Sequence, residues 1–272
     1  MFMRYVVGYD GSSPSEAALS WALSRARSAP APIVLVHVAE GDSGNMGGEF
    51  EDADARSGAA ILSSRLGGLH RSDPDLEVTG LALTGSVPWE LARAVVPSDL
   101  LVVGTHKTGF LHGRVLGSRS VQIAAAAPCC VAVIPEVDLR FRTGVVAGMD
   151  RASTAGAVAE LAADECVGRA DELTLVEAAP PGTPLQDRSA LSVGMVAARR
   201  RHPKLVLHSR TSSRSPAEAL LDASRGKSLL VLGPGSDSPD RSPIGSVLHD
   251  VLLNVNAPVL IARTIVAVPS GG

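Results

Sequence analysis

Near the start of the chain stands Tyr5-Val-Val-Gly-Tyr-Asp10-Gly-Ser-Ser-Pro-Ser-Glu-Ala-Ala-Leu19, and 140 residues later a similar stretch runs Val145-Val-Ala-Gly-Met-Asp150-Arg-Ala-Ser-Thr-Ala-Gly-Ala-Val158. In each stretch a short apolar run ends in Gly-x-Asp and leads into a helical pattern. The two halves also close alike, with Leu100-Leu-Val-Val-Gly104 and Gly117-Ser118 in the first and Leu229-Leu-Val-Leu-Gly233 and Gly245-Ser246 in the second. An internal repeat of this length indicates two copies of one domain, which we place at residues 1–137 and 143–265.

Each copy alternates short β-branched apolar runs with longer segments of helical periodicity. In the first copy we expect strands at residues 5–8, 33–38, 76–83, 100–103 and 130–134, and helices at 14–27, 55–69, 88–96 and 118–126. In the second copy we expect strands at 145–149, 173–177, 204–208, 229–232 and 259–262, and helices at 153–166, 189–200, 216–223 and 246–254.

Continuous apolar runs such as Ile33-Val-Leu-Val36 suit strands that are buried on both faces, as in a parallel sheet covered by helices. Right-handed crossovers then give an α/β fold of two tandem, doubly wound, Rossmann-like sheets of five parallel strands each. Residues 40–57, rich in Gly and acidic residues, and residues 178–188, rich in Pro, are predicted to be exposed loops. The seam at 136–142 is too short for a free tether, so the halves should pack on each other.

The composition excludes several classes of partner. A net charge of −3 gives no general attraction to nucleic acid or to an anionic membrane, and no apolar run reaches the ~18 residues of a spanning helix. Cys129, Cys130 and Cys166 lack metal-ligand spacing and are interpreted as small buried hydrophobes in a reducing compartment. Trp21 and Trp89 lie in amphipathic helices and are expected to face the core instead of stacking on bases. We therefore expect a cytoplasmic protein without a nucleic-acid partner, a membrane partner or a metal site.

The residues with chemical potential cluster at two strand ends. In a doubly wound sheet, ligands bind at the carboxyl ends of the strands where the winding reverses, here flanked by the first and fourth strands. These strands lead to Asp10 and Gly104, and a Gly-rich loop then runs from Gly104 to Gly117 and into the helix that begins at Ser118. Such a loop presents backbone N–H groups and the positive end of a helix to one spot, which is typical of an anion site, most often for phosphate.

This combination of motifs resembles the universal stress protein family in tandem form, over both halves of the chain. The family loop reads Gly-x2-Gly-x9-Gly-Ser/Thr and holds the phosphates of ATP in nucleotide-binding members. The resemblance implies a fold like that of the adenine-nucleotide alpha hydrolases. It also implies that Asp10 contacts the ribose or the adenine and that Val38 lies beside the base. The nucleotide-binding residues implied for the first half are Gly8, Asp10, Val38, Gly104, Lys107, Gly117 and Ser118.

One position departs from the family pattern, because Lys107 stands where the middle Gly belongs. A non-Gly residue costs about 1–2 kcal/mol where φ must be positive. A Lys ammonium 4 Å from a phosphate charge gains about 1 kcal/mol in water and about 4 kcal/mol at the effective dielectric of a partly buried site. The same stretch carries Arg114 and Arg119 and no acidic residue, so we expect anion binding here, assisted by Lys107.

The second half matches the pattern less well. Its loop from Gly233 to Gly245 is one residue shorter, and three prolines within it remove N–H donors that phosphate would need. Ala178 stands in place of Val38. We therefore expect a second, weaker site formed by Gly148, Asp150, Gly233, Gly235, Gly245 and Ser246.

Plainer interpretations of single residues stay open. Taken alone, Asp10 could be only the cap of the following helix, and the glycines could be only tight turns. His37 lies within a predicted strand and is interpreted as structural. His106 and His112 lie on the loop without a paired carboxylate or nucleophile spacing, so no catalytic role is expected of them.

The leading hypothesis is a regulatory or sensing module of the stress response that binds ATP or another adenine nucleotide, with or without Mg²⁺, mainly through the first half. We expect at most slow ATP hydrolysis and no other enzymatic activity, because nothing in the sequence positions a water molecule or a general base. The alternative is a nucleotide-free interaction scaffold with degenerate phosphate loops. Because two domains of the family pair through their last strands, the resemblance also implies a pseudo-dimer within this chain, with or without further homodimerisation.

Overall fold

The structure, a computed structural model, describes residues 2–40, 48–106, 118–168, 170–179, 189–235 and 244–263. These residues form one ten-stranded sheet in the order β3-β2-β1-β4-β5-β10-β9-β6-β7-β8. In the first half the strands are β1 (Tyr5–Gly8), β2 (Ile33–Ala39), β3 (Val78–Thr84), β4 (Leu100–Thr105) and β5 (Cys130–Pro135). In the second half they are β6 (Val145–Met149), β7 (Leu173–Ala178), β8 (Leu207–Ser212), β9 (Leu229–Leu232) and β10 (Val259–Ile261).

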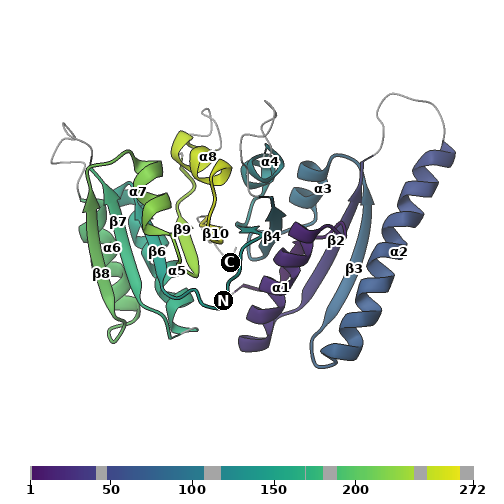
Figure 1. Ribbon diagram of the computed structural model, residues 1–272, viewed down its shortest axis with the longest axis horizontal. Coiled ribbons are helices and arrows are strands. Elements are labelled where there is room, and N and C mark those ends of the chain that lie inside the picture. The colour runs from purple at the N-terminus through teal and green to yellow at the C-terminus, as the bar shows by residue number, and fades with distance from the viewer. Residues whose placement is uncertain are drawn as a thin grey trace, which may run out of the picture.

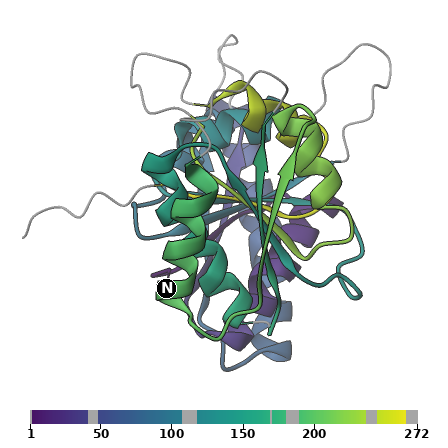
Figure 2. The same ribbon diagram turned by 90° about the vertical axis from the view of Figure 1, so that its left-hand side faces the viewer.

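Helices cover both faces of each half (Figures 1 and 2). The first half contains α1 (Ser13–Ser28), α2 (Gly48–Ser72), α3 (Val87–Arg93) and α4 (Ser118–Ala126). The second half contains α5 (Ala152–Val167), α6 (Ala190–Arg201), α7 (Pro216–Ala223) and α8 (Ser246–Leu253). Within each half all strand pairs are parallel, which confirms the predicted doubly wound α/β fold.

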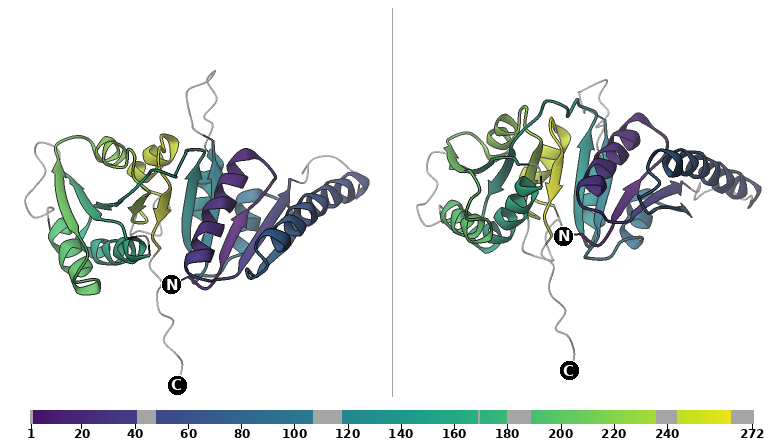
Figure 3. Two further views of the ribbon diagram at one scale, coloured as in Figure 1. Left: turned by 60° about the horizontal axis from the view of Figure 1, so that its bottom comes forward. Right: turned by 90° about the horizontal axis from the view of Figure 1, so that it is seen from below.

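The two halves join through their last strands. β10 pairs with β5 in antiparallel register, with Leu260 opposite Ala132, while every pairing inside a half is parallel. Figure 3 shows these strands meeting at the middle of the molecule. On one face of this seam α4 contacts α8, and Figure 1 shows the two helices side by side above it. The pseudo-dimer expected within the chain is therefore confirmed.

Two hydrophobic cores lie on the two faces of the sheet, and each continues through both halves. Successive strand residues point to opposite faces, so Val7 enters one core and Val6 the other. The first core packs α1, α2, α5 and α6 on the sheet, and the second packs α3, α4, α7 and α8. The halves thus share their buried apolar surface, as the short seam predicted.

The start of α1 shows how local sequence positions the first strand end. Ser12 is the N-cap residue, since its side chain accepts a hydrogen bond from the Ser15 N–H, and Pro14 follows in the first turn. Leu19 and Trp21 are among the buried residues of this helix. These features hold the chain after β1 in a tight turn that ends at the sheet edge.

Three expectations about the fold were wrong. The helix predicted at 55–69 begins earlier, at Gly48, so residues 48–54 are helical and not loop. The prediction failed there because these residues have no apolar periodicity that would indicate a helix. The strand predicted at 204–208 lies at Leu207–Ser212 instead. The prediction failed because this edge strand is mostly polar and exposed, and the apolar residues that indicated a strand precede it. Trp21 is buried as predicted, but the side chain of Trp89 is 65% exposed.

Candidate functional site

The carboxyl ends of β1 and β4 lie next to each other, as the winding rule predicted. Val7 pairs with Val102 in parallel register, and β2 flanks β1 on the other side. The order in which the strands are added to the sheet reverses between β1 and β4, so Asp10 and Gly104 face a crevice at this point.

A cavity of about 420 Å³ opens at this crevice. Its lining includes four residues predicted for the first site, Gly8, Asp10, Val38 and Gly104. Ser118 begins α4 at the same end of the sheet, and the next two residues of that helix line the cavity. The remaining predicted residues, Lys107 and Gly117, lie outside the described residues.

One part of the cavity wall is apolar. The side chains responsible come from β2, α2, α3, β4 and α4 and are Val36, Val38, Ile61, Val87, Leu91, Val103 and Ile123. Nδ1 of His37 lies 3.0 Å from the Tyr9 carbonyl oxygen, so this ring is held by the backbone, as expected of a structural histidine. A flat apolar ring would find complementary surface here.

Asp10 supplies an ionised acceptor at the edge of the cavity. Its Oδ1 accepts a hydrogen bond from the Ser12 N–H at 2.9 Å. Burial favours the neutral acid, but the hydrogen bonds from Ser12 and Ser15 outweigh it and lower the pKa of Asp10. Since Ser12 is the N-cap of α1, Asp10 is not the cap of that helix, and its exposed carboxylate can accept further hydrogen bonds.

Gly104 is required by the packing of α1 on β4. A Cβ atom at this position would lie 2.1 Å from the Pro14 carbonyl oxygen, a distance that no side chain can tolerate. At Gly8 an added Cβ would lie 3.3 Å from side-chain atoms of Leu91 and Val103. The two glycines therefore allow α1 and α3 to approach the strand ends closely and shape the cavity.

An ion pair at this cavity was missed by the sequence analysis. Nη2 of Arg119, in the first turn of α4, lies 2.7 Å from Oε2 of Glu40, which follows β2. Both residues line the cavity. The sequence indicates only that Arg119 is a cation near the Gly-rich loop and that Glu40 begins an exposed loop, and nothing in it relates the two residues.

The second half has a smaller cavity, of about 200 Å³, at the equivalent strand ends. Gly148, Asp150, Gly233 and Gly235 line it. Gly245 and Ser246 stand at the start of α8, and a Cβ added to Gly245 would lie 2.6 Å from the Gly235 carbonyl oxygen. The residues predicted for the second site thus lie close together, but the cavity that they surround is smaller than the one in the first half.

Arg151 crosses the second cavity, which it helps to line. Its Nε lies 3.2 Å from Oδ2 of Asp150, and its Nη2 donates a hydrogen bond of 2.6 Å to the Gly235 carbonyl oxygen. The side chain of Glu177, which is buried, also lines this cavity, at the position that His37 has in the first half. Its Oε1 accepts a hydrogen bond of 3.4 Å from the Leu191 N–H at the start of α6. Asp150 is therefore paired within the protein, and a second acidic side chain lines the cavity.

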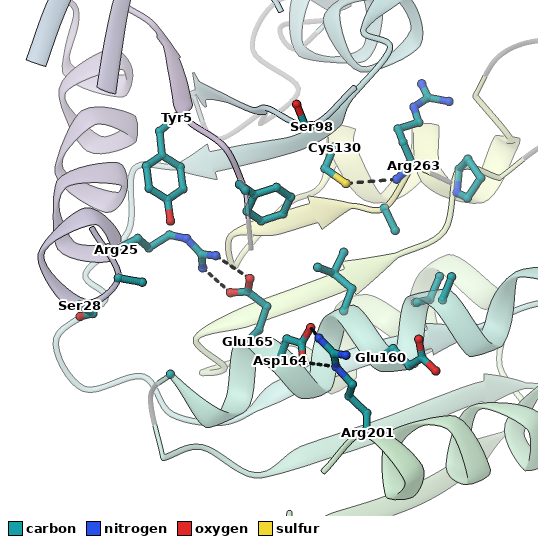
Figure 4. A pocket seen from close by; sticks show the side chains of 18 of the residues that line it. Tyr5, Arg25, Ser28, Ser98, Cys130, Glu160, Asp164, Glu165, Arg201 and Arg263 are labelled. Carbon is teal, nitrogen blue, oxygen red and sulfur yellow. Dashed lines mark hydrogen bonds and ion pairs between the residues drawn. The ribbon is translucent and has the colours of Figure 1, made fainter. Parts of the chain in front are cut away.

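A third cavity, of about 730 Å³, lies at the seam between α1 and α5 (Figure 4). Figure 4 shows Arg25 of α1 reaching Glu165 of α5, and Arg201 reaching Asp164. The remaining acid of this wall, Glu160, pairs with Arg200. Although this cavity is larger, its acids are paired with arginines, and its further cation, Arg263, donates a hydrogen bond to the Ala124 carbonyl oxygen. The cavity also lies away from the strand ends where doubly wound sheets bind ligands, so the strand-end cavity of the first half is the better candidate for an anionic ligand.

Two further features are absent from the described part of the chain. It contains no group of three or more His, Cys, Asp or Glu side chains that could hold a metal ion. Nor does any helix within it combine the length and the apolar character needed to cross a membrane.

Comparisons with known proteins agree with this architecture. The sequence model of the family described as "Universal stress protein family" matches residues 1–135. A universal stress protein of Mycobacterium tuberculosis is 29% identical over 208 residues, which span 69% of this chain and just under two thirds, 66%, of the relative. A second one from that organism is 27% identical over an alignment of 287 positions, which covers 95% of this chain and 96% of the relative. A crystal structure of a universal stress protein from Archaeoglobus fulgidus superposes with a TM-score of 0.78 at 15% identity, covering 97% of this chain and 99% of that one.

Proposed function

The chain belongs to the universal stress protein family, and from this premise we propose that its first half binds ATP or another adenine nucleotide as a regulatory or sensing module of the stress response. The observation that carries the proposal is the cavity of about 420 Å³ where Gly8, Asp10, Val38 and Gly104 meet the start of α4. Its volume falls within the ~300–1,000 Å³ of small-molecule sites, and its position is the one where doubly wound sheets bind ligands.

Each part of the nucleotide has a counterpart in this cavity. The apolar wall around Val36 and Val38 suits the adenine ring, and the ionised Asp10 suits the hydroxyl groups of the ribose. The phosphates would lie at the N-terminus of α4, where free backbone N–H groups and the helix dipole favour negative charge. Lys107 and Gly117 are proposed for the same end of the site.

We assign the protein a sensing role and no more than slow hydrolysis. The described ionisable groups nearest the proposed ribose are poor general bases, since the pKa of Asp10 is lowered by its hydrogen bonds and the His37 ring lies against the Tyr9 carbonyl oxygen. Neither is placed to activate a water molecule at a γ-phosphate. Incubation of the protein with Mg-ATP should therefore release phosphate at a rate far below one turnover per second, the lower end of ordinary enzymes.

We expect one ATP per chain in a calorimetric titration. The second cavity has about half the volume, its Asp150 is paired with Arg151, and Glu177 adds an acidic side chain to its lining. A flat titration at millimolar ATP would remove the proposal and leave the nucleotide-free scaffold. A stoichiometry of two would show that Arg151 does not obstruct the second site.

Replacement of Asp10 should weaken the binding of ATP. Asp10→Ala removes a charged acceptor for the ribose, and such hydrogen bonds contribute about 1.5–3 kcal/mol, so ATP should bind roughly 10- to 150-fold more weakly. The matched control is Asp150→Ala, which changes the equivalent residue of the second half and should leave the affinity for ATP unaltered. Equal affinities for the two variants would argue against a ribose contact by Asp10.

A further inference from the structure

We propose that Glu40 holds Arg119 across the mouth of the first cavity when no nucleotide is bound, and that Arg119 transfers to the phosphate chain when a nucleotide binds. This inference rests on the proposed function and assigns to Arg119 the recognition of phosphate charge. Glu40 follows the last residue of β2, beside the wall proposed for adenine, whereas Arg119 is the second residue of α4. Their 2.7 Å ion pair therefore links the base end of the cavity to its phosphate end.

The start of α4 is electrostatically unfavourable for the positive charge of Arg119. The N-terminus of a helix is its positive pole, where acidic side chains are favourable and cations are not. The helices α1, α3 and α7 follow this rule, with Glu16, Glu90 and Glu218 in their first turns, whereas α5, α6 and α8 have no acidic residue there. α4 has no acidic residue in its first turn and carries Arg119 there instead. An arginine at this pole needs an external anion, which Glu40 supplies in the structure described here.

The Arg119–Glu40 pair is weak enough to exchange. The two side chains are 63% and 54% exposed, and ion pairs in water contribute little to stability. A polyphosphate offers the planar guanidinium two oxygens and more than one negative charge, so it competes well with a single exposed carboxylate. Exchange leaves the Glu40 carboxylate in water at little cost, because it is already half exposed.

The second half lacks both members of the pair. In the strand register Val36 and Val176 occupy equivalent positions, so Glu40 corresponds to Pro180. Likewise Gly117-Ser118-Arg119 corresponds to Gly245-Ser246-Val247. The acid and the arginine are thus both present in the first half, whose cavity is larger, and both absent in the second half, where Arg151 crosses the cavity. This difference connects the ion pair with the first cavity.

The test is a calorimetric comparison of adenosine, AMP and ATP on the full chain and its variants. Arg119→Gln should weaken ATP binding about tenfold or more, AMP binding less, and adenosine binding not at all. Glu40→Gln should strengthen ATP binding about two- to fivefold, because the competing partner of Arg119 is removed. In the double variant the gain from Glu40→Gln should disappear. Arg93→Gln is the charge-matched control, because Arg93 is exposed on α3 and does not line the cavity.

Each outcome has a defined meaning. Equal losses for adenosine and ATP in Arg119→Gln would overturn the proposal, since they would indicate a general disturbance of the cavity. An unchanged ATP affinity in Arg119→Gln, or a weakened one in Glu40→Gln, would also overturn it while leaving the proposed function intact. If the unaltered protein binds neither adenosine nor ATP, the proposed function fails and this inference fails with it.

Discussion

Glu165→Ala is expected to lower the free energy of unfolding by about 3–5 kcal/mol, the cost of leaving one partner of a buried ion pair without the other. The side chains of Arg25 and Glu165 are only 14% and 5% exposed, and both carboxylate oxygens accept hydrogen bonds from the guanidinium. Burial opposes the charge of Arg25, but Glu165 outweighs it and raises the pKa of Arg25. Without Glu165 that charge would stay buried at the seam, beside the Tyr5 and Trp21 rings.

Denaturant unfolding of a small set of variants tests this expectation. The double variant Arg25→Met, Glu165→Leu should be close to the unaltered protein in stability, because apolar side chains of similar size often replace buried ion pairs without loss. Asp138→Ala breaks the exposed pair with Arg140 and should change the unfolding midpoint little. A Glu165→Ala variant as stable as Asp138→Ala would mean that water reaches the seam and that the pair does not hold the halves together.

Gly104→Ala is expected to abolish ATP binding and to lower the free energy of unfolding by about 1–3 kcal/mol or more, as overpacking does. The added Cβ would lie 2.1 Å from the carbonyl oxygen and 2.2 Å from the carbonyl carbon of Pro14. Since both are backbone atoms, relief requires a shift of the first turn of α1. That shift would move Asp10 and Ser12 out of the cavity wall.

The second half provides a matched control for this substitution. At the equivalent Gly233 an added Cβ would lie 3.4 Å from a methyl group of Val158, which is an ordinary contact. Gly233→Ala should therefore keep both the thermal midpoint and the affinity for ATP. If the two variants lose stability equally, the close approach of Pro14 is not the reason for a glycine at position 104.

The sequence predicted those features that follow from repetition and burial. β1, β6 and β9 have the expected bounds, because apolar runs between two helical layers leave a clear pattern. The proximity of Asp10 to Gly104 was also predicted, because the winding order of the sheet places β1 next to β4. β8 was misplaced because an edge strand with polar residues such as His208 and Arg210 has no such pattern.

Contacts made by long side chains across the strand ends could not be predicted. Arg151 bonds to a carbonyl 84 residues away, and Arg119 to a carboxylate 79 residues away. No periodicity in the sequence relates such partners, and their meeting depends on where each turn leaves the sheet. The unequal size of the two cavities was therefore visible only in the three-dimensional structure, although the shorter loop and its prolines had already pointed to a weaker second half.

The antiparallel pairing of β5 with β10 also limits how copies of this chain can assemble. The outer edge of each of these strands is hydrogen-bonded to the other strand, so neither edge is available for pairing with another molecule. The outermost strands are β3 and β8, and Arg210 and His208 on β8 discourage the edge-to-edge growth that leads to fibrils. By fusing the two domains, the chain has made the pairing of its last strands independent of protein concentration, and any larger oligomer has to be built from other surfaces.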